Sequence, residues 1–152
     1  MLPAVASVPW AAARVGSGDA ARPSLKAAVF FVSDDRFPVT WSGRTATVVV
    51  PGELDLTIAD GLREALLGVL NAGALGLVVD MSLTTFCDSA GISAITRAVR
   101  RATANDATVR LAVTSPAVLR VLDLVGIDRL IDIHPDASAA LASLPEHARN
   151  VS

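Results

Sequence analysis

The segment LGLVVDM, residues 75–81, constrains the fold more than any other part of the chain. It is a continuous apolar run with the length of a β-strand. Such a run predicts a strand that lies centrally in a sheet or is covered on both faces. Covering a sheet requires helices packed against it. We therefore expect the flanking segments to supply further strands and amphipathic helices.

Three helices are indicated by apolar periodicity and by residues that favour helix ends. The first begins at Thr57, which forms a variant of a capping box with Asp60. The second begins near Ser89. The third has Ser115 as its N-cap and Gly126 just past its end. The inward residues are Ile58, Leu62, Leu66 and Val69 in the first helix and Ile92, Ile95, Val99 and Ala102 in the second. Arg97, Arg100 and Arg101 are expected on or near the solvent side.

Shorter segments complete the sheet. A turn at Ser42 and Gly43 joins two β-branched runs and predicts a hairpin. Further along the chain, residues 108–114 and 130–133 predict strands, and residues 136–144 predict a terminal helix capped by Asp136. Because strands alternate with helices, the pattern predicts a single α/β sheet of four or five strands with about four helices packed on it.

The two ends of the chain are expected to lie outside this domain. Residues 1–35 are rich in Ala, Pro, Gly and Ser and lack periodicity in most of their length. We interpret them as a disordered or loosely attached extension. The segment 26–35 within it is also compatible with an edge strand. The domain then spans residues 36–145, and residues 146–152 form a frayed tail.

Composition and charge exclude several classes of function. A net charge of −2 and a pI near 5.6 provide no basic surface for nucleic acid. The longest uncharged run, between Glu64 and Asp80, is shorter than the roughly 20 residues of a membrane span. The N-terminus is a poor signal peptide, so we expect a cytoplasmic protein without membrane contact. The single cysteine, Cys87, allows no intrachain disulfide. No spacing of His and Cys or Gly-rich loop predicts a metal or cofactor.

A polar cluster follows the buried strand in the segment TTFCDSAGI, residues 84–92. It places Ser89 in the first turn of a helix, where unpaired N–H groups and the helix dipole favour an anion. A phosphate on Ser89 would add about −1.5 to −2 charges beside Asp88. Glu53 and Asp55 would also be close if the GELD segment, read as a loop, folds over the same edge. Asp and Ser are equally ordinary helix caps, and the residues alone leave both interpretations open.

Two other functions fit parts of this cluster. A serine after a strand and before a helix is the arrangement of a hydrolase nucleophile, but Cys87 replaces the first Gly of that motif. Only His134 and His147 are available as bases. Alternatively, Cys87 is a redox sensor, because a thiol before a helix can have a lowered pKa. Adjacent Asp88 opposes that shift, and Phe86 suggests burial and a packing role.

From about Thr45 to Leu144 the chain resembles the STAS-domain proteins of the anti-sigma factor antagonist (anti-anti-sigma factor) family. The similar segments are VVVPGELDL, LVVDMSLTTFCDSAGISAI, VRLAVTSPAVLRVLDLVGIDRLIDIH and the closing helix. The DSAG segment corresponds to the family's Asp-Ser-Ser-Gly signature, and GELD corresponds to its first loop. The resemblance implies a STAS-like mixed sheet and a transcription regulator that is not an enzyme.

The resemblance also implies a phosphorylation switch at Ser89. In the family, an anti-sigma factor with serine kinase activity phosphorylates this serine, and a serine phosphatase removes the phosphate. The unphosphorylated form binds the anti-sigma factor and frees a sigma factor. The chain departs from the signature at Ala90, where a second Ser is usual, and at Cys87. The positions carried over to the partner-binding face are Asp55, Thr57, Asp88, Ser89, Ala90, Gly91 and Ile92.

Overall fold

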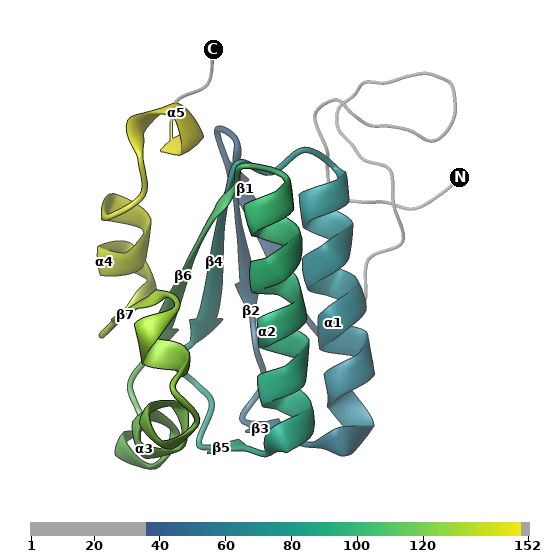
Figure 1. Ribbon diagram of the computed structural model, residues 1–152, viewed down its shortest axis with the longest axis vertical. Coiled ribbons are helices and arrows are strands. Elements are labelled where there is room, and N and C mark those ends of the chain that lie inside the picture. The colour runs from purple at the N-terminus through teal and green to yellow at the C-terminus, as the bar shows by residue number, and fades with distance from the viewer. Residues whose placement is uncertain (1–35, 150–152) are drawn as a thin grey trace.

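The apolar run that dominates the sequence forms β4 (Gly76–Met81), the central strand of a five-stranded sheet. The computed structural model describes residues 36–149. The strand order is β1-β2-β4-β6-β7, and β4 is paired in parallel with β2 on one side and β6 on the other (Figure 1). Because helices cover both faces at this strand, Leu77, Val78 and Val79 are completely buried.

The predicted hairpin forms the antiparallel edge of the sheet. It consists of β1 (Val39–Ser42) and β2 (Thr45–Val49). Gly43 in the turn has a φ of 60°, a conformation that a residue without a side chain adopts at little cost. At the other side, β6 (Thr108–Val113) and β7 (Asp132–His134) are parallel to β4. The mixed five-stranded sheet agrees with the expected fold class.

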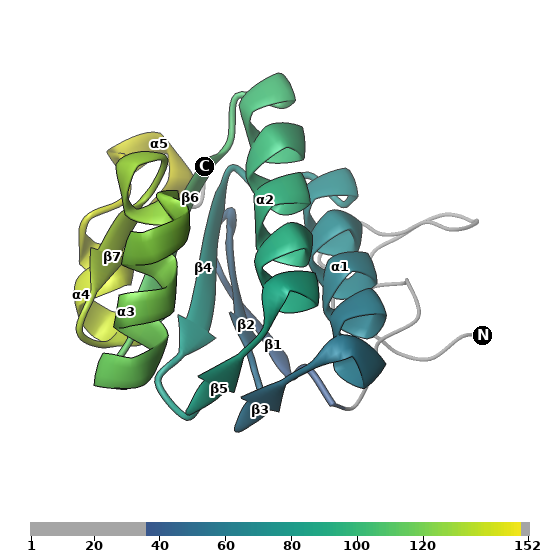
Figure 2. The ribbon, with the colours of Figure 1, turned by 60° about the horizontal axis from the view of Figure 1, so that its bottom comes forward.

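The helices lie in layers on the two faces of the sheet. α1 (Leu56–Asn71), α2 (Ser89–Ala104) and α3 (Pro116–Val125) contribute to the large apolar core on one face (Figure 2). α4 (Ala137–Ala142) covers the other face, where it packs in a smaller cluster. The smaller cluster consists of Val78, Ala112, Ala140 and Leu144. The predicted α3 termini are confirmed: Ser115 is the N-cap, and Gly126 is the C-cap with a φ of 83°.

The C-terminal boundary of the domain differs from the expected one. Residues expected in a frayed tail form the short helix α5 (Glu146–Arg149), in which Ala148 is buried. The hydroxyl of Thr45 donates a 2.6 Å hydrogen bond to the Ala148 carbonyl. A side chain at Gly76 would have no room here, since its Cβ would lie 2.7 Å from Thr45 Oγ1. The domain therefore extends at least to residue 149.

The last strand also begins later than predicted. After Gly126 the chain forms the 3₁₀ helix η1 (Ile127–Arg129), so β7 starts at Asp132 and excludes Leu130, which is 62% exposed. The proposed extension, including its possible edge strand at 26–35, and residues 150–152 lie outside the described residues. Within residues 36–149, no helix has the length and apolar character needed to cross a membrane.

Candidate functional site

The GELD and DSAG segments lie side by side because a two-residue strand lies within GELD and another directly precedes DSAG. β3 (Glu53–Leu54) pairs in parallel with β5 (Phe86–Cys87) in a small sheet outside the main one. The amide of Asp88 donates to the Leu54 carbonyl at 3.1 Å, and the amide of Thr85 donates to the Gly52 carbonyl at 2.7 Å. The sequence pattern predicts a loop at GELD and gives no sign of this pairing.

An aspartate follows each of these short strands and caps the next helix. Asp88 Oδ1 caps α2, because it accepts from the backbone amides of Ala90 at 3.0 Å and Gly91 at 3.2 Å. Asp55 Oδ1 caps α1 and accepts from the amide of Thr57 at 3.0 Å. The two N-caps follow residues that are paired between β3 and β5. The positive ends of both helix dipoles therefore lie at one edge of the molecule.

The start of α1 differs from its prediction. Asp55, not Thr57, is the N-cap, so the helix begins two residues earlier than a Thr57 cap would place it. The Thr57 hydroxyl instead donates to Asp55 Oδ1 at 2.6 Å. Asp60 forms an ion pair with Arg63 at 3.5 Å rather than closing a capping box. The hydrogen bond from the Thr57 hydroxyl is the main cause that lowers the pKa of Asp55, so this carboxylate stays charged at neutral pH.

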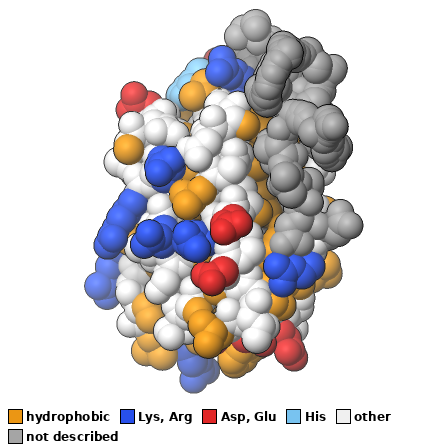
Figure 3. Space-filling model, turned by 90° about the vertical axis from the view of Figure 1, so that its right-hand side faces the viewer, with side chains coloured by type: hydrophobic (Ala, Val, Ile, Leu, Met, Phe, Trp, Pro, Cys, Tyr) orange, Lys and Arg blue, Asp and Glu red, His pale blue; other side chains and the backbone are white. Residues whose placement is uncertain are grey.

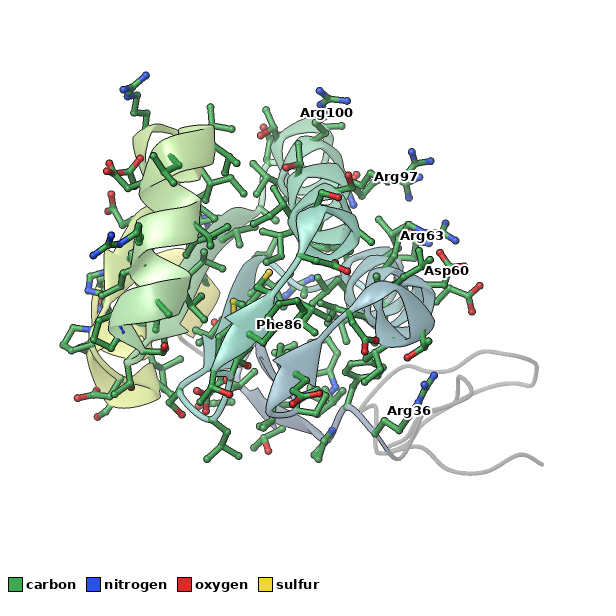
Figure 4. The ribbon with its side chains drawn as sticks, turned by 90° about the horizontal axis from the view of Figure 1, so that it is seen from below. Arg36, Asp60, Arg63, Phe86, Arg97 and Arg100 are labelled. Atoms are coloured by element: carbon green, nitrogen blue, oxygen red, sulfur yellow. The ribbon has the colours of Figure 1, made fainter. Side chains whose placement is uncertain are left out.

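Ser89 is the first residue of α2, and its side chain is exposed. Three large apolar side chains at the start of α1 and in or just before β5 are also exposed: Leu56 by 73%, Leu83 by 65% and Phe86 by 50%. Figure 4 looks onto this edge and shows Phe86 near its centre. Exposed apolar side chains bordered by polar residues are typical of a protein-docking surface. The exposure of these three side chains was not predictable from the sequence, because apolar periodicity does not distinguish an exposed Leu from a buried one.

Gly91 is buried between the start of α2 and the side chains of Leu54 and Cys87. A Cβ at this position would lie 2.6 Å from Leu54 Cγ and 3.0 Å from Cys87 Sγ. Gly91 thus lets α2 approach β3 closely and does not itself present a surface to a partner. Ala90 and Ile92 are partly buried, and Ile92 packs against the large core.

The environment of Cys87 favours packing over redox chemistry. Its side chain is 5% exposed, whereas the preceding Phe86 points outward, as alternation along a strand requires. Burial and, to a smaller extent, the charge of Asp88 raise the pKa of Cys87 from 9.0 to about 11. The reactive thiolate is therefore scarce at neutral pH.

Neither histidine lies beside Ser89. His147 belongs to α5, at the opposite end of the molecule from the start of α2 (Figure 1). His134 pairs with Ala112, whose side chain packs on the α4 face of the sheet, away from α2. The arrangement that a serine nucleophile needs is not formed with either residue. Within the described part of the chain, no three His, Cys, Asp or Glu side chains are grouped to hold a metal ion.

Comparison with known proteins places the chain in a family. A family model described as "Mlab, STAS domain" matches residues 37–132. The chain belongs to the STAS-domain family. The match includes the hairpin, the central strand, both capped helices and Ser89. A search of curated protein sequences gives no match.

Solved structures with the same fold include anti-sigma factor antagonists. One from Mycobacterium paratuberculosis is 24% identical, with a TM-score of 0.66 over 71% of this chain and 92% of that protein. A putative one from Thermotoga maritima is 21% identical, with a TM-score of 0.67 over 71% and 93%. The Bacillus cell fate determinant SpoIIAA in its phosphorylated form is 19% identical, with a TM-score of 0.55 over 68% and 95%. These similarities establish the STAS fold.

Proposed function

We propose that this STAS domain is an anti-sigma factor antagonist that docks through the edge formed by the starts of α1 and α2. The observation that carries the proposal is the exposed Ser89 at the N-terminus of α2, at the edge where Leu56 at the start of α1 and Phe86 of β5 are also exposed. The solved anti-sigma factor antagonists with this fold support the choice of partner. In its unphosphorylated form the domain binds an anti-sigma factor and thereby frees a sigma factor for transcription.

Phosphorylation of Ser89 by the anti-sigma factor, acting as a serine kinase, ends the interaction. A neutral hydroxyl can be covered by a partner at the cost of one or two exchanged hydrogen bonds. A phosphate adds about −1.5 to −2 charges, and covering it without a countercharge is strongly unfavourable. Asp88 and Asp55 already place two carboxylates at this edge, so the added charge also increases local repulsion. A serine phosphatase restores binding.

The test compares three variants of Ser89 for binding to the anti-sigma factors of the source organism, each purified separately. Ser89→Ala should retain the affinity of the wild-type protein, because it keeps the site neutral. Ser89→Asp and Ser89→Glu should weaken binding by about a hundredfold or more, which corresponds to roughly 3 kcal/mol. Isothermal titration calorimetry measures the three affinities. Incubation with ATP should add one phosphate to the wild type and none to Ser89→Ala.

A matched control is available on the opposite face of the sheet. Ser138 is also exposed in the first turn of a helix with an aspartate N-cap, α4, so Ser138→Asp adds the same charge near a helix N-terminus. This variant should bind like the wild type. Equal affinities of Ser89→Ala and Ser89→Asp for every anti-sigma factor tested would contradict the proposal. Covalent labelling of Ser89 by a fluorophosphonate probe would instead favour a hydrolase.

The location of the protein, its need for cofactors and its lack of a catalytic task follow from the same proposed role. A protein that exchanges with an anti-sigma factor works in the cytoplasm, where sigma factors engage the polymerase. The interaction needs no cofactor, nucleic acid or membrane. The domain itself has no catalytic task, since the kinase and phosphatase reactions belong to its partners.

A further inference from the structure

A strip of arginine side chains continues from Ser89 along the outer surface of the helices. It consists of Arg97 and Arg100 of α2 and Arg63 of α1, and we call it the arginine strip. Figure 4 shows the three side chains extending outward along the same flank of the molecule. α2 contains three arginines and no acidic residue, whereas the chain as a whole has a net charge of −2. Seen from the side of α1, basic side chains gather toward the border where α2 lies (Figure 3).

The strip lies within reach of a partner that covers Ser89. With about 100° of rotation per residue, Ser89, Arg97 and Arg100 all fall on the solvent face of α2. A rise of 1.5 Å per residue places Arg97 roughly 12 Å and Arg100 roughly 16 Å along the helix from Ser89. A protein interface of ordinary size covers about 800 Å² per partner and is thus roughly 30 Å across. A footprint centred on Ser89 would therefore reach this part of α2.

The packing and hydrogen bonds of the fold do not explain why positions 97 and 100 are arginines. Arg101 is explained by its place in the last turn, near the negative end of the helix dipole, and by its hydrogen bond to Asn71. Arg97 and Arg100 are exposed and form no hydrogen bond or ion pair with any residue in the range 36–149. Like charges three and four residues apart mildly destabilise a helix, so this spacing of arginines disfavours α2 in isolation.

Charge is unevenly divided along this face. Glu53, Asp55 and Asp88 lie at the Ser89 end, and Arg97 and Arg100 lie farther along α2. Arg63 is paired with Asp60, so Arg97 and Arg100 carry the unpaired positive charge of the strip. We propose that the anti-sigma factor presents an acidic surface that contacts Arg97 and Arg100. This inference rests on the proposed function. Such complementarity fixes the orientation of the partner and speeds association, because the strip attracts an acidic surface before contact.

The test reverses the charge of the strip. The variant Arg97→Glu with Arg100→Glu should associate at least tenfold more slowly with the anti-sigma factor that binds Ser89→Ala. Its dissociation rate should change less, because the strip lies away from the centre of the interface. Raising the salt concentration should slow association of the wild type more than that of the variant. Surface plasmon resonance at several salt concentrations measures both rates. The new carboxylate at position 97 lies four residues before Arg101, a spacing that supports the helix.

Arg120→Glu provides the matched control, since it makes the same charge change at an exposed position of α3. It should leave the association rate within about twofold of the wild type. An unchanged or increased association rate in the double variant would overturn the inference, even if binding still depends on Ser89. Absence of any Ser89-dependent binding would count against the proposed function instead. Binding of the wild type, but not of the double variant, to vesicles of acidic phospholipid would assign the strip to a lipid surface and also overturn the inference.

Discussion

Gly91 allows the start of α2 to lie directly against β3. Any larger residue would clash, because a Cβ at this position would lie 2.6 Å from Leu54 Cγ. The close approach leaves the Ser89 side chain exposed while Cys87 beneath it remains buried. Asp88 adds a second constraint through its two hydrogen bonds to the first turn. At the scale of single residues, the DSAG segment therefore combines a packing requirement, a helix cap and an accessible hydroxyl.

The burial of Cys87 leads to a prediction about the reactivity of its thiol. Because burial raises its pKa to about 11, the folded protein should react slowly with iodoacetamide at pH 7 and 8. The reaction rate should increase only as the pH approaches 11, whereas the urea-unfolded chain should react at the rate of an ordinary thiol. Mass spectrometry after timed quenching measures both rates. Rapid alkylation of the folded protein at pH 7 would favour the redox interpretation.

The same shift determines how stability depends on pH. The thiol has a pKa of 9.0 when unfolded and about 11 when folded, so the unfolded state loses its proton first as the pH rises. The full stability is present below pH 9, and Cys87 reduces it between pH 9 and 11 by at most about 2 to 3 kcal/mol. The chain contains no tyrosine, so no phenol ionises in this range. Cys87→Ala should flatten the alkaline part of a urea-denaturation series.

At the scale of elements, α5 shows that a four-residue helix can be part of the domain. Ala148 is buried, and its carbonyl accepts from Thr45 at the start of β2. We expect a chain ending at residue 145 to be less stable than one ending at residue 149 by about 2 to 4 kcal/mol, since it loses buried apolar surface and leaves the buried Thr45 hydroxyl unpaired. Urea denaturation followed by circular dichroism measures the difference.

Thr45→Val separates the two contributions to this difference. It removes the hydroxyl and keeps the shape, so in the longer chain it should cost about 1 kcal/mol. In the chain ending at 145 it should be neutral or stabilising, because no unpaired hydroxyl remains. Equal stability of the two chains would mean that residues 146–149 behave as the frayed tail expected from the sequence.

These elements also show what could be predicted from the sequence and why. β4, the start of α2 and both ends of α3 were predicted nearly to the residue, because long apolar patterns and end residues such as Ser115 and Gly126 are local signals. β3 and β5 were missed, because two residues carry no periodicity and their pairing joins positions 33 residues apart. α5 was missed for a similar reason, since its contact with Thr45 spans 103 residues. The position of Ser89 in the first turn of α2 was predictable, but the exposure of Leu56, Leu83 and Phe86 was not.

At the scale of the whole molecule, the proposed switch should change the proposed docking surface and leave the fold intact. Ser89 is exposed and lies outside both cores, so a charge there displaces no packed side chain. A negative charge in the first turn of a helix stabilises it by about 0.3 to 1 kcal/mol, which opposes the repulsion from Asp88.

We therefore expect Ser89→Asp to lose affinity for the anti-sigma factor without losing stability. Its melting temperature should stay within about 3 °C of the wild type or rise, since 1 kcal/mol corresponds to roughly 4 to 8 °C in a domain of this size. Differential scanning calorimetry measures this, and Ser138→Asp reports the effect of the same charge at another helix start. In NMR spectra, shifts beyond the local electrostatic effect should be confined to β3, β5 and the first turns of α1 and α2. A drop of more than 8 °C, or shifts throughout the sheet, would mean that the charge acts by unfolding the domain, and the loss of binding would then need no docking surface at Ser89.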